Sequence, residues 1–109
     1  MKIKYELQPE PHTLDQFAKL HNLTMRVVER EAWQVNTGRP RFYAEFENAE
    51  VKIGHLLCAF YGDGNTIFEA IKDYFERVQG CTLVINAANK DKRKELRVPY
   101  ELKLEWTDE

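Results

Sequence analysis

The stretch Gly62–Gly80, GDGNTIFEAIKDYFERVQG, decides the fold because it carries a complete set of helix signals. Thr66 and Glu69 have the spacing of a capping box, in which each side chain accepts a hydrogen bond from the other residue's backbone N–H. Gly80 supplies the stop that ends many helices. The sequence therefore predicts a helix over Ile67–Gln79. Apolar residues recur along it at helical spacing, at Ile67, Ala70, Ile71, Tyr74, Phe75 and Val78.

Upstream of this helix, alternation of apolar and polar side chains predicts three strands. The first covers Leu23–Arg30. The second begins near Arg41, and its apolar phase slips after Glu47, as one inserted bulge residue would cause. Gly54 then predicts a hairpin turn into a third strand, Leu56–Tyr61. Both faces of that strand are apolar, so we expect it to be central in the sheet or covered on both faces.

Downstream of the helix, Thr82–Ala87 has the composition of a buried strand. A polar turn over Asn89–Lys94 follows, and Glu95–Trp106 then alternates strictly for twelve residues, which predicts a long strand with one wet face. Pro99 either places this strand at a sheet edge or breaks it in two. Alternation in residues 1–7 indicates a further short strand that could pair with it.

A second helix is predicted near the start of the chain. Thr13 and Gln16 form another capping-box pattern, and the apolar spacing after them indicates a helix over Leu14–His21 with Asn22 as a left-handed stop. The segment Glu31–Pro40 shows neither period and is expected to be a loop.

Together these elements predict an α+β fold for a single domain, residues 1–109. We expect an antiparallel sheet of four to six strands with two helices packed on one face, in the order α-β-β-β-α, followed by a C-terminal β-hairpin. A chain of 109 residues with 43% hydrophobic residues can build one core without metals or disulfides. Cys58 and Cys81 are accordingly interpreted as reduced, buried residues.

Several functional classes are disfavoured. The net charge of −2 argues against coating nucleic acid by bulk charge. We find no apolar run of signal-peptide or membrane-spanning length, so we expect a cytoplasmic protein. His12, His21 and His55 fall in no catalytic or zinc motif, which predicts no enzyme activity, no metal and no cofactor. Gly62 and Gly64 are explained by a turn that needs positive backbone angles.

Two sets of side chains are candidates for binding a partner. One is a basic cluster near the predicted C-terminal hairpin, which we call the basic tip: Lys90, Lys92, Arg93, Lys94 and Arg97. The other combines strand arginines with aromatic residues that offer stacking surfaces: Arg26, Arg30, Arg41, Trp33 and Tyr43. The basic tip also has a structural explanation, because lysines on a turn keep an edge strand from aggregating.

The order of elements over residues 13–79, with the Gly-rich turn Gly62–Thr66, resembles the double-stranded RNA-binding domain. In that family a lysine cluster opens the second helix and bridges phosphates. This sequence has Ile67, Phe68 and Glu69 there instead, so the resemblance extends to the shape and not to the chemistry.

Nearly the whole chain resembles small uncharacterised proteins encoded by bacteriophages and prophages. The resemblance implies a phage-derived accessory protein in the bacterial host cytoplasm. The segments that carry it are Arg41–Phe46, Glu50–Lys52, Tyr61–Thr66, Glu69–Ile71 and Leu96–Pro99.

From these observations we expect a non-catalytic macromolecular binding module. Its partner would be a host or phage protein, bound so as to inhibit host machinery or defence, with the Glu95–Trp106 strand adding to a partner sheet. The alternative is a nucleic-acid-binding protein that uses the basic tip and the strand arginines. Self-pairing of an edge strand would make a homodimer.

Overall fold

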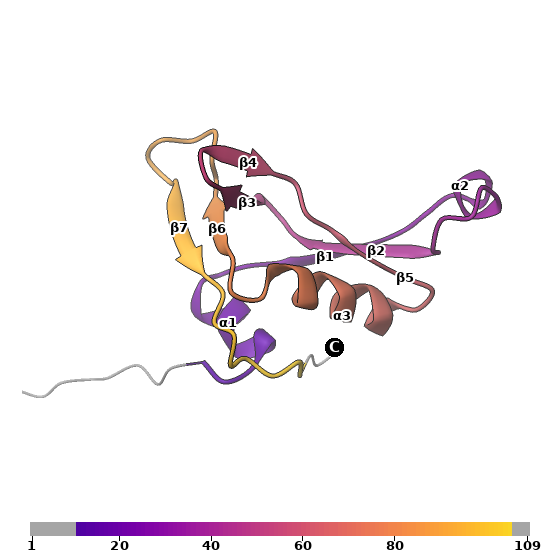
Figure 1. Cartoon of the computed structure of the whole chain (residues 1–109), viewed down its shortest axis with the longest axis horizontal. Coiled ribbons are helices and arrows are strands. Elements are labelled where there is room, and N and C mark those ends of the chain that lie inside the picture. Colours follow the sequence, from indigo (N-terminus) through magenta and orange to yellow (C-terminus); the bar gives the residue numbers. More distant parts are fainter. Residues whose placement is uncertain (1–10, 106–109) are drawn as a thin grey trace, which may run out of the picture.

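The computed structural model describes residues 11–105 and confirms the α+β class (Figure 1). The predicted strand over residues 1–7 and the end of the predicted strand at Trp106 lie outside the described residues. The elements along the chain are α1 (Leu14–Leu20), β1 (Met25–Glu29), α2 (Ala32–Asn36), β2 (Phe42–Phe46), β3 (Ala49–Ile53), β4 (Leu56–Cys58), β5 (Gly62–Gly64), α3 (Ile67–Val78), β6 (Thr82–Ile85) and β7 (Lys94–Arg97).

The strands form two antiparallel sheets, where the sequence predicted one. Their orders are β1-β2-β5 and β4-β3-β6-β7. The chain passes from the first sheet to the second through Glu47 and Asn48, and Asn48 has a φ of 56°. Its carbonyl accepts a hydrogen bond of 2.9 Å from the N–H of Asn86 in the second sheet's hairpin. The phase slip after Glu47 is therefore a turn between sheets, and the bulge prediction was wrong.

Helix α3 lies against the first sheet and begins with the predicted cap. The Thr66 hydroxyl accepts a hydrogen bond of 3.1 Å from the Glu69 N–H. Strand β5 passes so close to α3 that a Cβ on Gly62 would lie 2.1 Å from the Tyr74 nitrogen, and one on Gly64 2.3 Å from the Ala70 nitrogen. Neither glycine has a positive φ. Their role is close packing, so the explanation by positive backbone angles was wrong.

The core is formed by α1, α3 and strands of both sheets. Tyr74 is nearly fully buried, its ring meets Phe46 edge to face at 5.5 Å, and burial raises the pKa of Tyr74 to about 12. Core side chains from along the chain include Leu14, Phe17, Phe46, Val51, Ile71, Tyr74, Val78, Leu83, Val98 and Leu102.

Two strand predictions need correction. The stretch Leu56–Tyr61, expected to be central, forms only the short strand β4 at the edge of the second sheet, with Leu56 68% exposed. The long strand Glu95–Trp106 is replaced by β7, which ends before Pro99. After Pro99 the chain runs beside the start of α1, where Lys103 accepts a hydrogen bond of 3.0 Å from the Leu14 N–H.

The expected loop Glu31–Pro40 contains a five-residue helix, α2. The Gln34 side chain accepts a hydrogen bond of 3.1 Å from the Glu31 N–H as part of a capping box. Between α1 and α3 the chain therefore forms five strands and a helix, and the α-β-β-β-α order expected from the double-stranded RNA-binding resemblance is not confirmed. Within residues 11–105, no helix is long and apolar enough to cross a membrane.

Candidate binding cleft at the α2 end

Helix α2 stands at the end of a ribbon made by β1 and β2 (Figure 1). The two strands pair antiparallel with Val28 opposite Tyr43, and the Arg30 N–H donates a hydrogen bond of 2.7 Å to the Arg41 carbonyl where the ribbon opens into α2. Tyr43 is also opposite Asp63 of β5. This register brings side chains from β1, β2, α2 and β5 to one end of the molecule.

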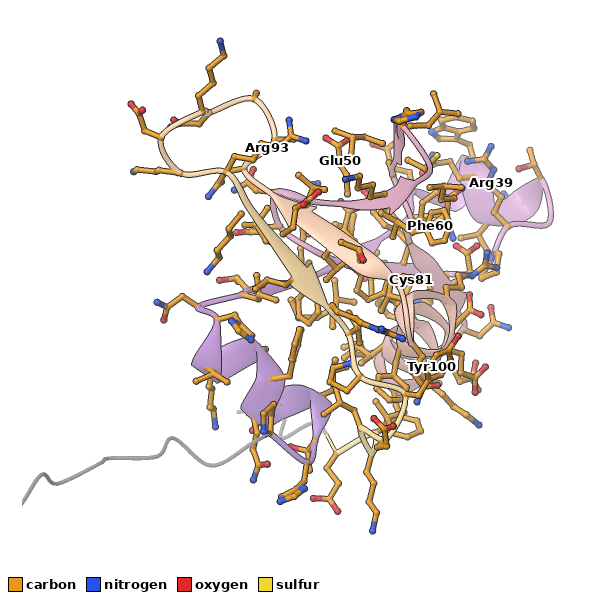
Figure 2. The ribbon with its side chains drawn as sticks, turned by 60° about the vertical axis from the view of Figure 1, so that its left-hand side comes forward. Arg39, Glu50, Phe60, Cys81, Arg93 and Tyr100 are labelled. Atoms are coloured by element: carbon orange, nitrogen blue, oxygen red, sulfur yellow. The ribbon has the colours of Figure 1, made fainter. Side chains whose placement is uncertain are left out.

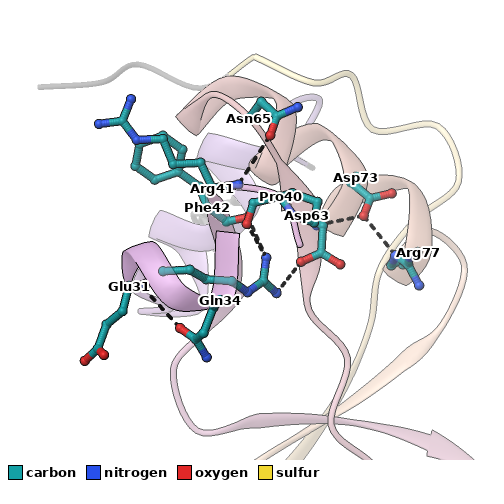
Figure 3. A network of polar contacts seen from close by, with 10 residues as sticks. Glu31, Gln34, Pro40, Arg41, Phe42, Asp63, Asn65, Asp73 and Arg77 are labelled. Carbon is teal, nitrogen blue, oxygen red and sulfur yellow. Dashed lines mark hydrogen bonds and ion pairs between the residues drawn. The ribbon is translucent and has the colours of Figure 1, made fainter. Parts of the chain in front are cut away.

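Arg30 joins these elements, and Figure 3 labels its partners Pro40, Phe42 and Asp63. Its side chain is only 5% exposed and forms an ion pair with Asp63, while Nη1 donates hydrogen bonds to the carbonyls of Pro40 at 2.8 Å and Phe42 at 3.4 Å. A buried guanidinium needs such partners because removing its charge from water is costly. Arg30 therefore fastens the ribbon to β5.

The network continues into α3 (Figure 3). The Asp63 N–H donates a hydrogen bond of 2.8 Å to Oδ2 of Asp73. The same oxygen accepts a hydrogen bond of 3.1 Å from Nε of Arg77. A further hydrogen bond, of 3.3 Å, runs from the Arg41 N–H to Oδ1 of Asn65. The end of the ribbon is thus held to the sheet and to the first turns of α3 by charged and backbone groups.

Two tyrosines flank Arg30. Its guanidinium lies 5.1 Å from the Tyr43 ring centroid and 5.9 Å from that of Tyr61, within the range of cation–π attraction. The two rings meet edge to face at 6.0 Å. Tyr61 is 44% exposed. The rings are therefore held in place and still reach solvent.

These side chains line an open cleft of about 310 Å³, which we call the α2 cleft: Arg30, Gln34, Arg39, Tyr43 and Tyr61. Arg39 is exposed and has no acidic partner among residues 11–105, so it supplies an uncompensated positive charge. Trp33, on the same helix as Gln34, is 63% exposed, and its indole N–H donates a hydrogen bond of 2.8 Å to Glu31. The cleft thus combines aromatic faces with one free cation, and a further exposed aromatic ring stands on α2.

The remaining arginines of the ribbon carry acidic partners. Arg41 pairs with Glu29 at 2.8 Å, and Arg26 pairs with Glu45 at 3.6 Å. With Arg30 bound to Asp63, all three predicted strand arginines are compensated.

The basic tip lies elsewhere. Figure 2 places Arg93 and Arg39 on opposite sides of the molecule, and Figure 1 shows the β6–β7 connection far from α2. The structure therefore does not bring the tip together with Arg30 and Arg41. Lys90, Lys92 and Arg93 are exposed and form no ion pair in the described part of the chain, although the charge of Arg93 contributes to lowering the pKa of Glu95.

The other two cations of the tip lie beside α1. Lys94 Nζ donates a hydrogen bond of 3.2 Å to the His21 carbonyl. Burial, and then the charge of Lys94, lower the pKa of His21 below its ordinary value. Arg97 lines a second cavity, of about 530 Å³, with His12, His21 and Glu101. Among residues 11–105, no group of three or more His, Cys, Asp or Glu side chains could hold a metal ion.

Of the predicted partner-binding residues, Arg30 and Tyr43 line the α2 cleft, and Trp33 is exposed on α2. The sequence did not identify Gln34, because α2 itself was not predicted. Nothing in the linear pattern placed Tyr61 beside Tyr43. No protein-family model, curated protein or solved structure matches the chain.

Proposed function

We propose that this protein is a non-catalytic binding module that recognises another protein through the α2 cleft and Trp33. The observation that supports this is the composition of the site. Tryptophan, tyrosine and arginine dominate the binding energy of protein interfaces. Here Tyr61 and Arg39 are exposed in the cleft, Trp33 is exposed on α2, and Arg30 holds the end of the ribbon in place. Rigid side chains lose less conformational entropy on binding, which favours affinity.

The charge balance favours a protein partner over nucleic acid at this site. Binding to a phosphate backbone requires several uncompensated cations along a groove. Along the ribbon, Arg26, Arg30 and Arg41 are paired with carboxylates, and among the residues that line the cleft only Arg39 lacks an acidic partner. One free arginine beside aromatic faces suits an acidic side chain within a largely apolar protein surface.

The resemblance to phage-encoded proteins makes a host or phage protein the expected partner, with steric occlusion as the mechanism. We assign partner binding to the α2 end and not to strand addition by Glu95–Trp106, because β7 has only four residues and ends before Pro99. The partner would cover the cleft mouth and the exposed ring of Trp33.

The experiment that tests the proposal is affinity capture from bacterial lysate, with and without nuclease. The wild-type chain is compared with a Trp33→Ala, Arg39→Ala double variant and with a control double variant, Phe68→Ala, Lys72→Ala. Phe68 is 57% exposed, close to the 63% of Trp33, and both cations are exposed. Helix α2 has no buried residue, so the test variant should keep its fold, which thermal unfolding verifies.

We expect the α2 variant to capture about tenfold less, or lower still, of a protein partner that resists nuclease treatment, because truncation of hot-spot residues weakens binding by that order. The control variant should retain that partner. Equal capture by all three chains would remove the α2 cleft from the proposal. Loss of the partner on nuclease treatment would instead support the nucleic-acid alternative through the basic tip.

A further inference from the structure

The outer edge of β4 is an unprotected strand edge. Sheet edges expose unpaired backbone groups, and proteins usually guard them with charged residues. Strand β7, the other edge of the same sheet, carries Lys94, Glu95 and Arg97, and the β1 edge carries Arg26 and Glu29. Leu56–Cys58 carries no charge. Figure 1 shows β4 at the margin of its sheet.

The side chains of β4 are apolar on both faces. Leu56 is opposite Ile53 on one face, and these residues are 68% and 50% exposed. Leu57 points to the other face, where it is opposite Lys52 and 36% exposed. The charge of Lys52 is compensated by Glu95 at 2.8 Å, a contact that also holds the pKa of Glu95 below its ordinary value. Apolar surface thus borders the free edge above and below.

The register identifies the backbone groups that are free. Ile53 and Leu56 flank a two-residue turn at Gly54, whose φ is 60°, and such a turn closes on a hydrogen-bonded pair. The next pair, Lys52 and Leu57, is then a non-hydrogen-bonded pair. The N–H and C=O of Leu57 therefore point away from β3, toward the open edge.

We infer that a second copy of this chain occupies the β4 edge, with Leu57 opposite Leu57 across a two-fold axis in antiparallel pairing. A two-fold interface places residues close to the axis near their own copies, so a charge there would meet a like charge. Strand β4 avoids this conflict and supplies a donor and an acceptor from the same residue, which can bond reciprocally to its symmetry mate. The pairing joins the two four-stranded sheets and covers Leu56 and Leu57.

The first test compares molecular mass by sedimentation equilibrium for the wild-type chain, Leu57→Lys and Leu20→Lys. Leu20 is a matched control at the end of α1, since it is 39% exposed against 36% for Leu57. We expect a wild-type dimer, a dissociation constant raised about tenfold or more by Leu57→Lys, and no change for Leu20→Lys. A wild-type chain that stays monomeric up to about 1 mM would overturn the inference. So would equal effects of the two lysines.

A second test does not depend on a disruptive variant. In the proposed pairing, the two copies of Cys58 lie diagonally across the axis, about 7–8 Å apart. A short bismaleimide should therefore link a Cys81→Ser chain through Cys58, and should fail to link a Cys58→Ser chain that keeps Cys81. A dimer whose two Cys58 residues are not linked by the bismaleimide would contradict pairing through β4.

Discussion

At the residue scale, the glycines of β5 show how one residue type can serve different needs. Gly38, Gly54 and Gly80 have positive φ values, as turns require. Gly62 and Gly64 do not have positive φ values. Glycine is needed at these positions because α3 leaves no room for a Cβ. Sequence alone could not separate these roles, since the difference depends on a helix that packs back onto the strand. The asparagine stop at Asn22 was predictable because it follows a periodic helix.

Replacing Gly62 by alanine is expected to destabilise the fold by about 3 kcal/mol or more, because the new Cβ meets helix backbone that cannot move aside. Gly38→Ala is the control. Nothing lies within 4 Å of its Cβ position, so only the strain at φ 95° applies, about 1 kcal/mol. Urea unfolding measures both. Similar losses for the two variants would show that β5 and α3 are not in close contact.

At the scale of elements, burial decides which segments the sequence reveals. Helix α3 was predictable because five of its side chains are buried at helical spacing. Helix α2 was not, because none of its residues is buried and its cap is Glu31, outside the usual set of cap residues. After Arg97 the alternation predicted a strand that does not form. Val98 and Leu102 are buried there, so the apolar pattern is real, but the chain is irregular.

Arg30→Met should loosen the whole α2 end. It leaves the Asp63 carboxylate and the Pro40 carbonyl without their partner, and breaking a buried pair costs about 3 kcal/mol. Arg26→Met removes an exposed pair and should cost less than about 1 kcal/mol. Hydrogen exchange provides a local measurement: amides of residues 31–41 should lose protection in the first variant only. Unchanged exchange there would mean that Arg30 does not hold the ribbon.

At the scale of the whole molecule, the sequence predicted the class of the fold and not its division into two sheets. That division depends on the turn at Asn48. In the sequence this turn shows only as a change in the apolar alternation, and a bulge would produce the same change. The candidate site was out of reach for a related reason. Arg30 and Asp63 are 33 positions apart and meet only through the register of β1, β2 and β5.

The distribution of charge makes a prediction for nucleic acid. Three cations stand at the outer end of the tip, Lys90, Lys92 and Arg93, and none of their side chains forms an ion pair or a hydrogen bond to a carbonyl among residues 11–105. Binding to DNA through them would release counterions from at most three phosphates, so the logarithm of affinity should fall against that of salt with a slope of about −3 or shallower. Filter binding across a salt series measures this slope. A much steeper slope would show that DNA contacts more cations than these three.

Because α2 contributes nothing to the hydrophobic interior, its surface can change while the rest of the molecule stays constant. Randomising Trp33 and Arg39 with their exposed neighbours would leave every core side chain in place. The ribbon end is thus a natural location for a combinatorial library, from which variants with new targets can be selected.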